Sequence, residues 1–193
     1  MVTSEFAEHV FDRVVAAFRN IEPAVRADAY VASLFVYDER DDPRFPTVTP
    51  DYNTESHVEA QQRRWGTDPN EARWNYARWD QAHLALIAHS EFDPDGARLR
   101  ERWVKEQLQM WYEDDAVEFD PRGEPITQAF VDLLVEVVQR LHRDGVVTQI
   151  FGRVLPVLIY ELEYYDAIAE QNLRANPDGV IPPDFVAFCT GAP

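Results

Sequence analysis

The residues best suited to chemistry in this sequence are three carboxylates that lie close together after residue 160. They are Glu161, Glu163 and Asp166. If residues 154–163 form a strand, Glu161 and Glu163 project from the same face at its end, and Asp166 opens the helix that follows. Three converging carboxylates can bind a divalent cation or perform acid–base chemistry. The alternative is structural, because acidic side chains also stabilise the first turn of a helix.

Other signatures of catalysis are absent from the sequence. The five histidines have no metal-ligand spacing, and the seven glycines form no phosphate-binding motif. Cys189 has no neighbouring histidine, and no Gly-x-Ser-x-Gly nucleophile motif occurs. We therefore predict no cofactor. Catalysis stays an open question, with a binding protein favoured over an enzyme.

The strongest signal in the composition is negative charge. The sequence has 35 acidic and 18 basic residues, which leave a formal net charge of −17 on 193 residues. A small domain needs a net charge of only ~2–8 to stay in solution. The excess favours a basic protein partner, and it argues against nucleic acid as a ligand because the field repels phosphates.

Acidic residues are concentrated in two segments that we expect to be loops. The first joins two strands, and the second links two helices. Negative charge on exposed loops attracts a cationic partner during diffusional encounter, so both loops are predicted to bind the partner. The residues concerned are Asp38, Glu39, Asp41 and Asp42 in the first loop, and Glu113, Asp114 and Asp115 in the second.

The five tryptophans all fall between residues 65 and 111. Tryptophan dominates both protein cores and interaction hot spots. A helix from residue 69 to residue 79 would carry Trp74, Tyr76 and Trp79 on too many faces for all three to be buried. We therefore predict that Trp74 or Trp79 is exposed as an anchor for the partner, and a core role for both is the alternative.

Length and periodicity predict one α+β domain, residues 1–193, in which a small antiparallel or mixed sheet packs against several amphipathic helices. Residues 80–90 fit either a helix or a strand, and the Pro-interrupted segment 179–193 is expected to be irregular. Caps and apolar spacing predict the remaining elements. The helices are expected at 5–19, 55–65, 69–79, 97–112, 125–144 and 164–175, and the strands at 29–37, 45–48 and 154–160.

The N-terminus has neither the basic region nor the apolar core of a signal peptide. No apolar run approaches the ~18–20 residues that cross a bilayer. A single cysteine fits a reducing compartment. We therefore expect a cytoplasmic protein with no membrane partner, and we leave its oligomeric state open.

Several short motifs follow one another in the first 96 residues. An amphipathic helix precedes a strand ending in Tyr37-Asp38, then a helix start at Asn53-Thr54-Glu55, then Arg73-Trp74 with Trp79 nearby. This order resembles the bacterial domain-of-unknown-function family numbered 4303. Such domains are often linked with immunity proteins of bacterial polymorphic toxins. The resemblance implies that the chain inhibits a basic toxin domain by binding it, and it transfers no catalytic residue.

Overall fold

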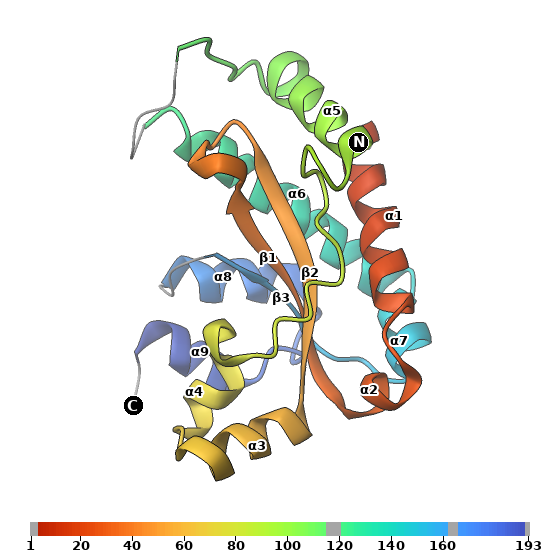
Figure 1. The fold of residues 1–193 in the computed structure, drawn as a ribbon, viewed down its shortest axis with the longest axis vertical. Helices are drawn as coiled ribbons and strands as arrows, with labels where there is room; N and C mark the ends of the chain where they lie inside the picture. The colour runs from red at the N-terminus through yellow and green to blue at the C-terminus, as the bar shows by residue number, and fades with distance from the viewer. Residues whose placement is uncertain (1–3, 115–120, 162–165, 192–193) are drawn as a thin grey trace.

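The computed structural model describes residues 4–114, 121–161 and 166–191. Within them, a three-stranded sheet runs through the middle of the molecule and helices surround it (Figure 1). The strands are β1 (Ala29–Asp38), β2 (Pro46–Thr54) and β3 (Val157–Tyr160). β1 is central, antiparallel to β2 and parallel to β3. The predicted α+β fold with a small mixed sheet is thereby confirmed.

The central strand is buried on both faces. Val31, Ala32, Ser33 and Leu34 have no exposed surface. A nearly uninterrupted apolar run is typical of a strand that is covered on both sides. Because side chains alternate along a strand, Ala32 and Leu34 join one hydrophobic cluster and Val31 joins another. The sheet therefore separates two cores.

The larger core lies between the sheet and two amphipathic helices, α1 (Glu5–Arg19) and α6 (Glu124–Arg143). Both helices were predicted from apolar residues that recur every three to four positions. Phe6 of α1 packs against Phe130 of α6 and against Trp103, with ring centroids 6.0 and 5.4 Å apart. The same core receives side chains from α5 (Pro94–Arg102), the π-helical turn η3 (Trp103–Leu108) and α7 (Val146–Phe151), and α2 (Pro23–Asp28) leads into β1.

The second core covers the opposite face of the sheet. Its helices are α4 (Pro69–Trp74), α8 (Asp166–Ala175) and α9 (Pro183–Thr190). Trp74, Tyr160 and Phe185 meet at its centre, with Phe185 5.5 Å from Trp74 and 6.1 Å from Tyr160 between ring centroids. The remaining long helix, α3 (Glu55–Trp65), starts directly after β2, where the Thr54 hydroxyl accepts a hydrogen bond from the His57 amide.

The outer edge of β3 is closed by Asn172 of α8 and by Asn176, the residue directly after that helix. The Asn172 side chain accepts from the Ile159 amide at 2.7 Å and donates to the Ile159 carbonyl at 3.0 Å. Asn176 does the same for both backbone groups of Val157, at 2.8 and 3.0 Å. Residues four apart lie on one helix face, so the two amides replace a neighbouring strand.

The outer edge of β2 is covered by the chain between η2 (Tyr76–Arg78) and α5. Ile87 exchanges two backbone hydrogen bonds with Val48, at 3.0 and 3.2 Å, as an isolated bridge. Both alternatives that we predicted for residues 80–90, a helix or a strand, are therefore wrong. Gln81, His83 and Ala88 have positive φ angles of 50°, 46° and 64°, which interrupt any regular pattern.

Four other predicted boundaries need correction. The helix expected at 69–79 ends at Trp74, and the one expected at 97–112 ends at Leu108 because Gln109 turns left-handed, with φ 57°. β2 continues to Thr54, beyond the predicted 45–48. Segment 179–193 is not irregular throughout, since Pro183 occupies the first turn of α9. In the part of the chain described, no helix is both long and apolar enough to cross a bilayer.

Replacing Asn172 with alanine should destabilise the fold. The change leaves the buried Ile159 amide without a partner, whereas the Ile159 carbonyl keeps a hydrogen bond from Gln171 at 3.2 Å. The expected cost is about 1–3 kcal/mol in the free energy of unfolding. Urea unfolding measures it. The exposed Asn70→Ala serves as the control and should change stability by less than about 0.5 kcal/mol. An N172A protein as stable as this control would contradict our account of the β3 edge.

Candidate functional site

Arg44 joins the two acidic loops, which lie about 70 residues apart in sequence. Its Nη2 lies 2.6 Å from the Asp42 carboxylate in the first loop. Its Nη1 donates to the carbonyls of Tyr112 and Asp114 in the second, at 2.7 and 3.0 Å. The guanidinium also lies 4.6 Å from the centroid of the Tyr112 ring. A buried arginine that donates hydrogen bonds to both loops holds them together at one end of the molecule.

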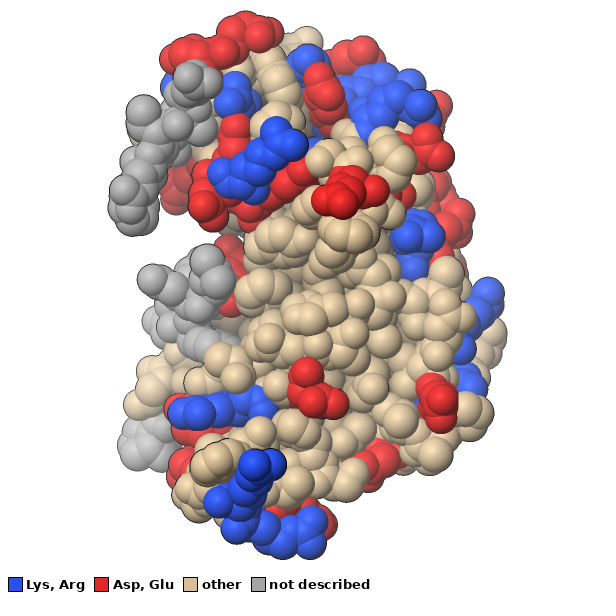
Figure 2. Space-filling view, viewed as in Figure 1, with Lys and Arg blue, Asp and Glu red and all other residues tan. Residues whose placement is uncertain are grey.

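Figure 2 shows acidic and basic side chains crowded together at this end and a largely uncharged surface across the middle of the view. Asp41, Glu113 and Asp114 are exposed, and Asp42 is half-buried. Asp114 lies 3.0 Å from Arg122, with 74% of its side chain exposed. Asp115 falls outside the described residues. Sequence reasoning treated the loops separately, because nothing in the pattern around Arg44 indicates its distant carbonyl partners.

Asp38, the last residue of β1, lies in an unfavourable electrostatic environment. Its Oδ1 is enclosed and has no hydrogen-bond partner among the described residues. Burial, followed by the negative charges of Asp42, Glu161 and Asp41, raises the pKa of Asp38 to about 6. The neighbouring charges place Asp38 close to Asp41, Asp42 and Glu161. We call Asp38, Asp41, Asp42, Glu113, Asp114 and Glu161 the acidic face.

The predicted carboxylate cluster after residue 160 is only partly described. Glu161 is half-buried beside Asp38, and burial raises its pKa although Gln171 donates a hydrogen bond to it. Glu163 lies outside the described residues, as does the side chain of Asp166, the first residue of α8. Within the described part, no three His, Cys, Asp or Glu side chains are grouped so as to hold a metal ion. The structure thus adds Glu161 to the acidic face.

Three other carboxylates point inward and hold the chain that covers β2. Asp51 accepts hydrogen bonds from the amides of Ala82 and His83, at 3.1 and 3.4 Å. Burial raises the pKa of Asp51, and these hydrogen bonds oppose the shift. The sequence analysis did not single out Asp51, whose role depends on amides about 30 residues away.

The other two inward carboxylates are Glu39 and Asp93. Glu39, predicted to bind the partner, is 5% exposed and accepts a hydrogen bond from the Ser90 amide at 3.0 Å. Asp93 accepts from the Ala88 amide at 2.9 Å and lies 2.8 Å from His9. Burial would raise the pKa of both acids, but these contacts lower it overall.

The tryptophans predicted as exposed anchors are buried. Trp74 is 1% exposed and Trp79 is 5% exposed. The indole of Trp74 donates to Asp184 at 3.0 Å, and that of Trp79 donates to the Arg73 carbonyl at 3.0 Å. Both rings reach the second core because α4 ends at Trp74 and the chain turns, so they do not share one helix. Trp65, at the end of α3, is 67% exposed instead.

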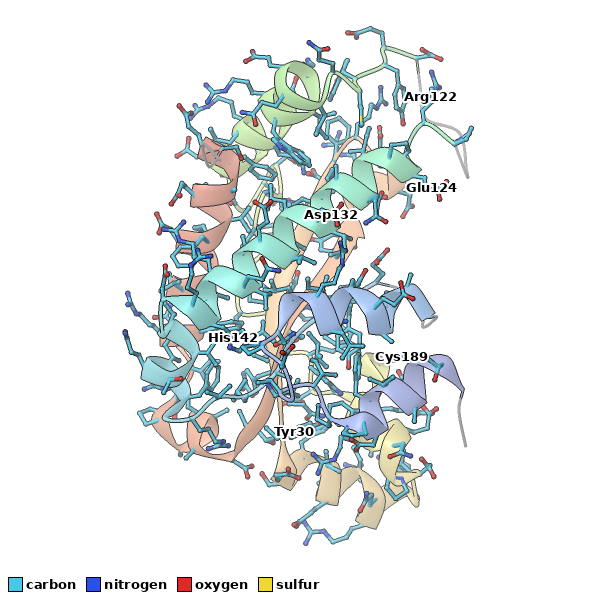
Figure 3. All side chains as sticks on the ribbon, turned by 180° about the vertical axis from the view of Figure 1, so that it is seen from behind. Tyr30, Arg122, Glu124, Asp132, His142 and Cys189 are labelled. Atoms are coloured by element: carbon cyan, nitrogen blue, oxygen red, sulfur yellow. The ribbon has the colours of Figure 1, made fainter. Side chains whose placement is uncertain are left out.

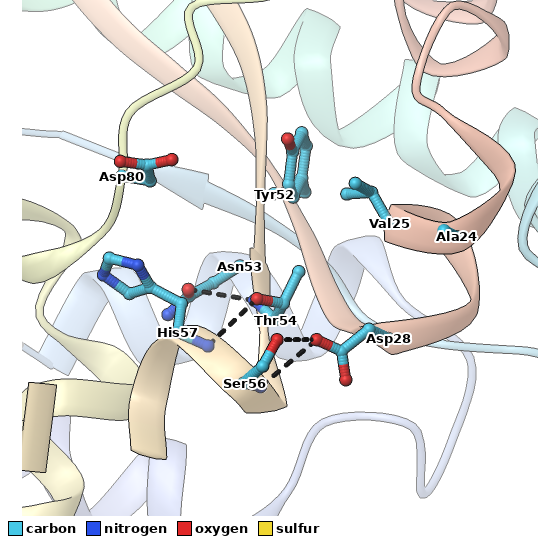
Figure 4. Close-up of a pocket in the computed structure, with 9 residues that line it drawn as sticks. All are labelled: Ala24, Val25, Asp28, Tyr52, Asn53, Thr54, Ser56, His57 and Asp80. Atoms are coloured by element: carbon cyan, nitrogen blue, oxygen red, sulfur yellow. Dashed lines mark hydrogen bonds between the residues drawn. The ribbon is translucent and has the colours of Figure 1, made fainter. Parts of the chain in front are cut away.

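A pocket of about 450 Å³ lies between α2, the end of β2 and the start of α3 (Figure 4). Its polar groups are largely bonded to one another or to the backbone. Asp28 accepts hydrogen bonds from the Ser56 amide and hydroxyl, which lower its pKa. The His57 Nε2 lies 2.9 Å from the Arg78 carbonyl oxygen. This arrangement offers no nucleophile or acid–base pair.

The back of the molecule carries charges that are balanced across helices (Figure 3). Asp132 on α6 lies 3.0 Å from Arg174 on α8. Arg140 lies 2.8 Å from Glu8 on α1 and 3.3 Å from Asp144. Such exposed pairs contribute little to stability but they neutralise the surface. These pairs offset part of the acidic charge on this side of the molecule.

Comparison with known proteins found no match to a family model, a curated protein or a solved structure. Family 4303 therefore remains a predicted relationship.

Asp38→Asn should stabilise the protein at neutral pH. Because the pKa of Asp38 is about 6 when folded and 3.8 ordinarily, ionisation penalises the folded state as pH rises through this interval. The amide removes that penalty, which we expect to be about 1–2 kcal/mol at pH 7.5 after solvent screening, and the gain should vanish below about pH 4. Urea unfolding at both pH values measures it. Asp178→Asn, at an exposed position away from the acidic face, is the charge-matched control. A D38N protein less stable than wild type at pH 7.5 would contradict this account.

Proposed function

We propose that this chain is a cytoplasmic binding protein whose acidic face captures a basic protein. The observation that carries the proposal is the contact of Arg44 with both acidic loops, which brings their charges onto one surface. Two separated loops would each exert a weak, screened field, whereas adjacent carboxylates produce a local potential that steers a cationic partner.

The state of Asp38 supports this function. A carboxyl group with an enclosed, unpartnered oxygen and acidic neighbours is costly to ionise. An arginine or lysine of a partner that approached the acidic face would supply the missing positive charge. Binding would then remove part of a cost that the free protein bears.

The rigidity of the loops supports it too. Arg44 is 8% exposed and bonded to both loops, so their backbones are positioned before a partner arrives. Preorganised groups lose less conformational entropy on binding than mobile ones. We infer an inhibitor that covers a basic functional surface, and the resemblance to family 4303 favours an immunity-type inhibitor of a toxin domain.

The test is calorimetric titration of the chain with the purified proteins that its flanking genes encode. We expect a basic one to bind at about 50 mM salt and to bind much more weakly at about 500 mM, because exposed charges are screened. The D41N/E113Q double variant removes two exposed charges from the acidic face and should weaken binding about tenfold, which is about 1.4 kcal/mol.

The matched control is E136Q/D178N, which removes two exposed charges from α6 and from the loop before α9. Its affinity should stay within about twofold of wild type. The proposal fails if no basic protein binds at low salt, or if both double variants weaken binding equally.

A further inference from the structure

A second pocket lies beside the acidic face and has the opposite character. It has a volume of about 300 Å³ and is bounded by the loop after β1, the chain before α5 and one side of α5. Three of its lining residues are arginines, Arg40, Arg98 and Arg100. In a chain with a net charge of −17, a concave site lined by three guanidinium groups needs a physical reason.

Arg100 forms the buried wall of this pocket, with 3% of its side chain exposed. All its hydrogen bonds leave from Nη1, which donates to the Ala88 carbonyl at 2.7 Å, and to the Phe45 carbonyl and Glu39 at 3.3 Å. Nε is enclosed without a partner, and Nη2 makes no hydrogen bond to any described residue. Unsatisfied donors on a buried cation are rare in proteins.

The unsatisfied edge has a known chemical complement. Nε and Nη2 of a guanidinium point in parallel, and together they match two oxygens of a carboxylate or phosphate. Nη2 is not enclosed as Nε is, so an entering oxygen meets Nη2 first. One oxygen of a carboxylate or phosphate would then give Nη2 the partner that it lacks, and a second oxygen would reach Nε only after the atoms that enclose Nε move.

Glu39 does not fill this role. Its carboxylate already accepts hydrogen bonds from the amide and hydroxyl of Ser90, and it reaches Arg100 only at Nη1. Burial raises the pKa of Glu39, but these contacts lower it by more, so the net shift is downward. Glu39 therefore stays ionised and holds one side of the guanidinium. The other acid of the lining, Glu101, lies 2.6 Å from Lys105 and is balanced by it.

The mouth of the pocket is also positive. Arg40 and Arg98 have 79% and 75% of their side chains exposed. Arg40 has a left-handed backbone, φ 63°, which is uncommon for a long side chain. Arg98 lies 2.9 Å from Asp95, and Arg40 approaches Glu39 only at 3.9 Å. Both side chains are exposed and can turn toward an anion, Arg98 by leaving its exposed ion pair with Asp95.

We propose that this Arg100 pocket binds a small oxyanion, a carboxylate or a phosphate, through Nη2 of Arg100 with Arg40 and Arg98 at the mouth. A volume of about 300 Å³ is large enough for a small oxyanion. The site adjoins the acidic face, because Asp38 and Arg100 interact electrostatically, and it would give the protein a ligand besides its basic partner. Its occupancy would also tie the loop after β1 to α5 through one bound anion.

The experiment is calorimetric titration and thermal unfolding of the full chain with sodium malonate and with sodium phosphate, against sodium chloride at equal ionic strength. We expect saturable heat and a raised unfolding midpoint with at least one oxyanion. Arg40→Gln and Arg98→Gln should each weaken that binding by up to about fivefold, the worth of one exposed charge contact. The exposed Arg19→Gln, at the end of α1, is the charge-matched control and should bind as wild type does.

Arg100→Lys keeps the positive charge but removes the guanidinium nitrogens that would contact the anion. It should abolish oxyanion binding while the circular dichroism spectrum stays that of the native fold. If that variant does not fold, the Arg40 and Arg98 variants decide the question. Equal unfolding midpoints in malonate, phosphate and chloride would overturn the proposal. So would equal oxyanion affinities in R40Q, R98Q and R19Q.

Discussion

Both edges of the small buried sheet must be supplied with hydrogen-bond partners that are not strands, and the rest of the structure depends on this constraint. β3 uses the side-chain amides of Asn172 and Asn176. β2 uses the backbone of residues 84–87, a segment with no regular structure of its own. An irregular segment has many unpaired amides, and buried ones cost free energy. On either side of residues 84–87, Asp51 accepts a hydrogen bond from the Ala82 amide, Asp93 from that of Ala88 and Glu39 from that of Ser90.

The acidic excess therefore has two structural roles. One group of carboxylates points inward and replaces backbone acceptors, and Arg100 partly balances Glu39 within it. A second group points outward and is gathered by Arg44 into the acidic face. Only part of the net charge of −17 lies on the surface that we propose for the partner, because the inward carboxylates do not contribute to it. The outward carboxylates come from two loops that are far apart in the sequence but lie together in the fold.

The sequence predicts those helices and strands that depend mainly on their own residues, through caps and apolar spacing. α1, α3 and α6 follow from caps and apolar spacing, and β1 follows from its apolar run. The path of residues 80–90 and the burial of Trp74 and Trp79 could not be predicted, because distant groups decide them. The acidic loops were identified as segments, but their contact through Arg44 depends on the folded chain. The Arg100 pocket likewise combines residues from three segments.

Amide hydrogen exchange in the 80–93 segment tests the central claim, that inward carboxylates hold this irregular chain against the sheet. The account predicts that the amides of Ala88 and Ser90 exchange slowly, at rates set by opening of the fold, because Asp93 and Glu39 accept their hydrogen bonds. Exchange at the rate of an open loop at both positions would contradict it. The acidic excess would then have no structural role in this segment.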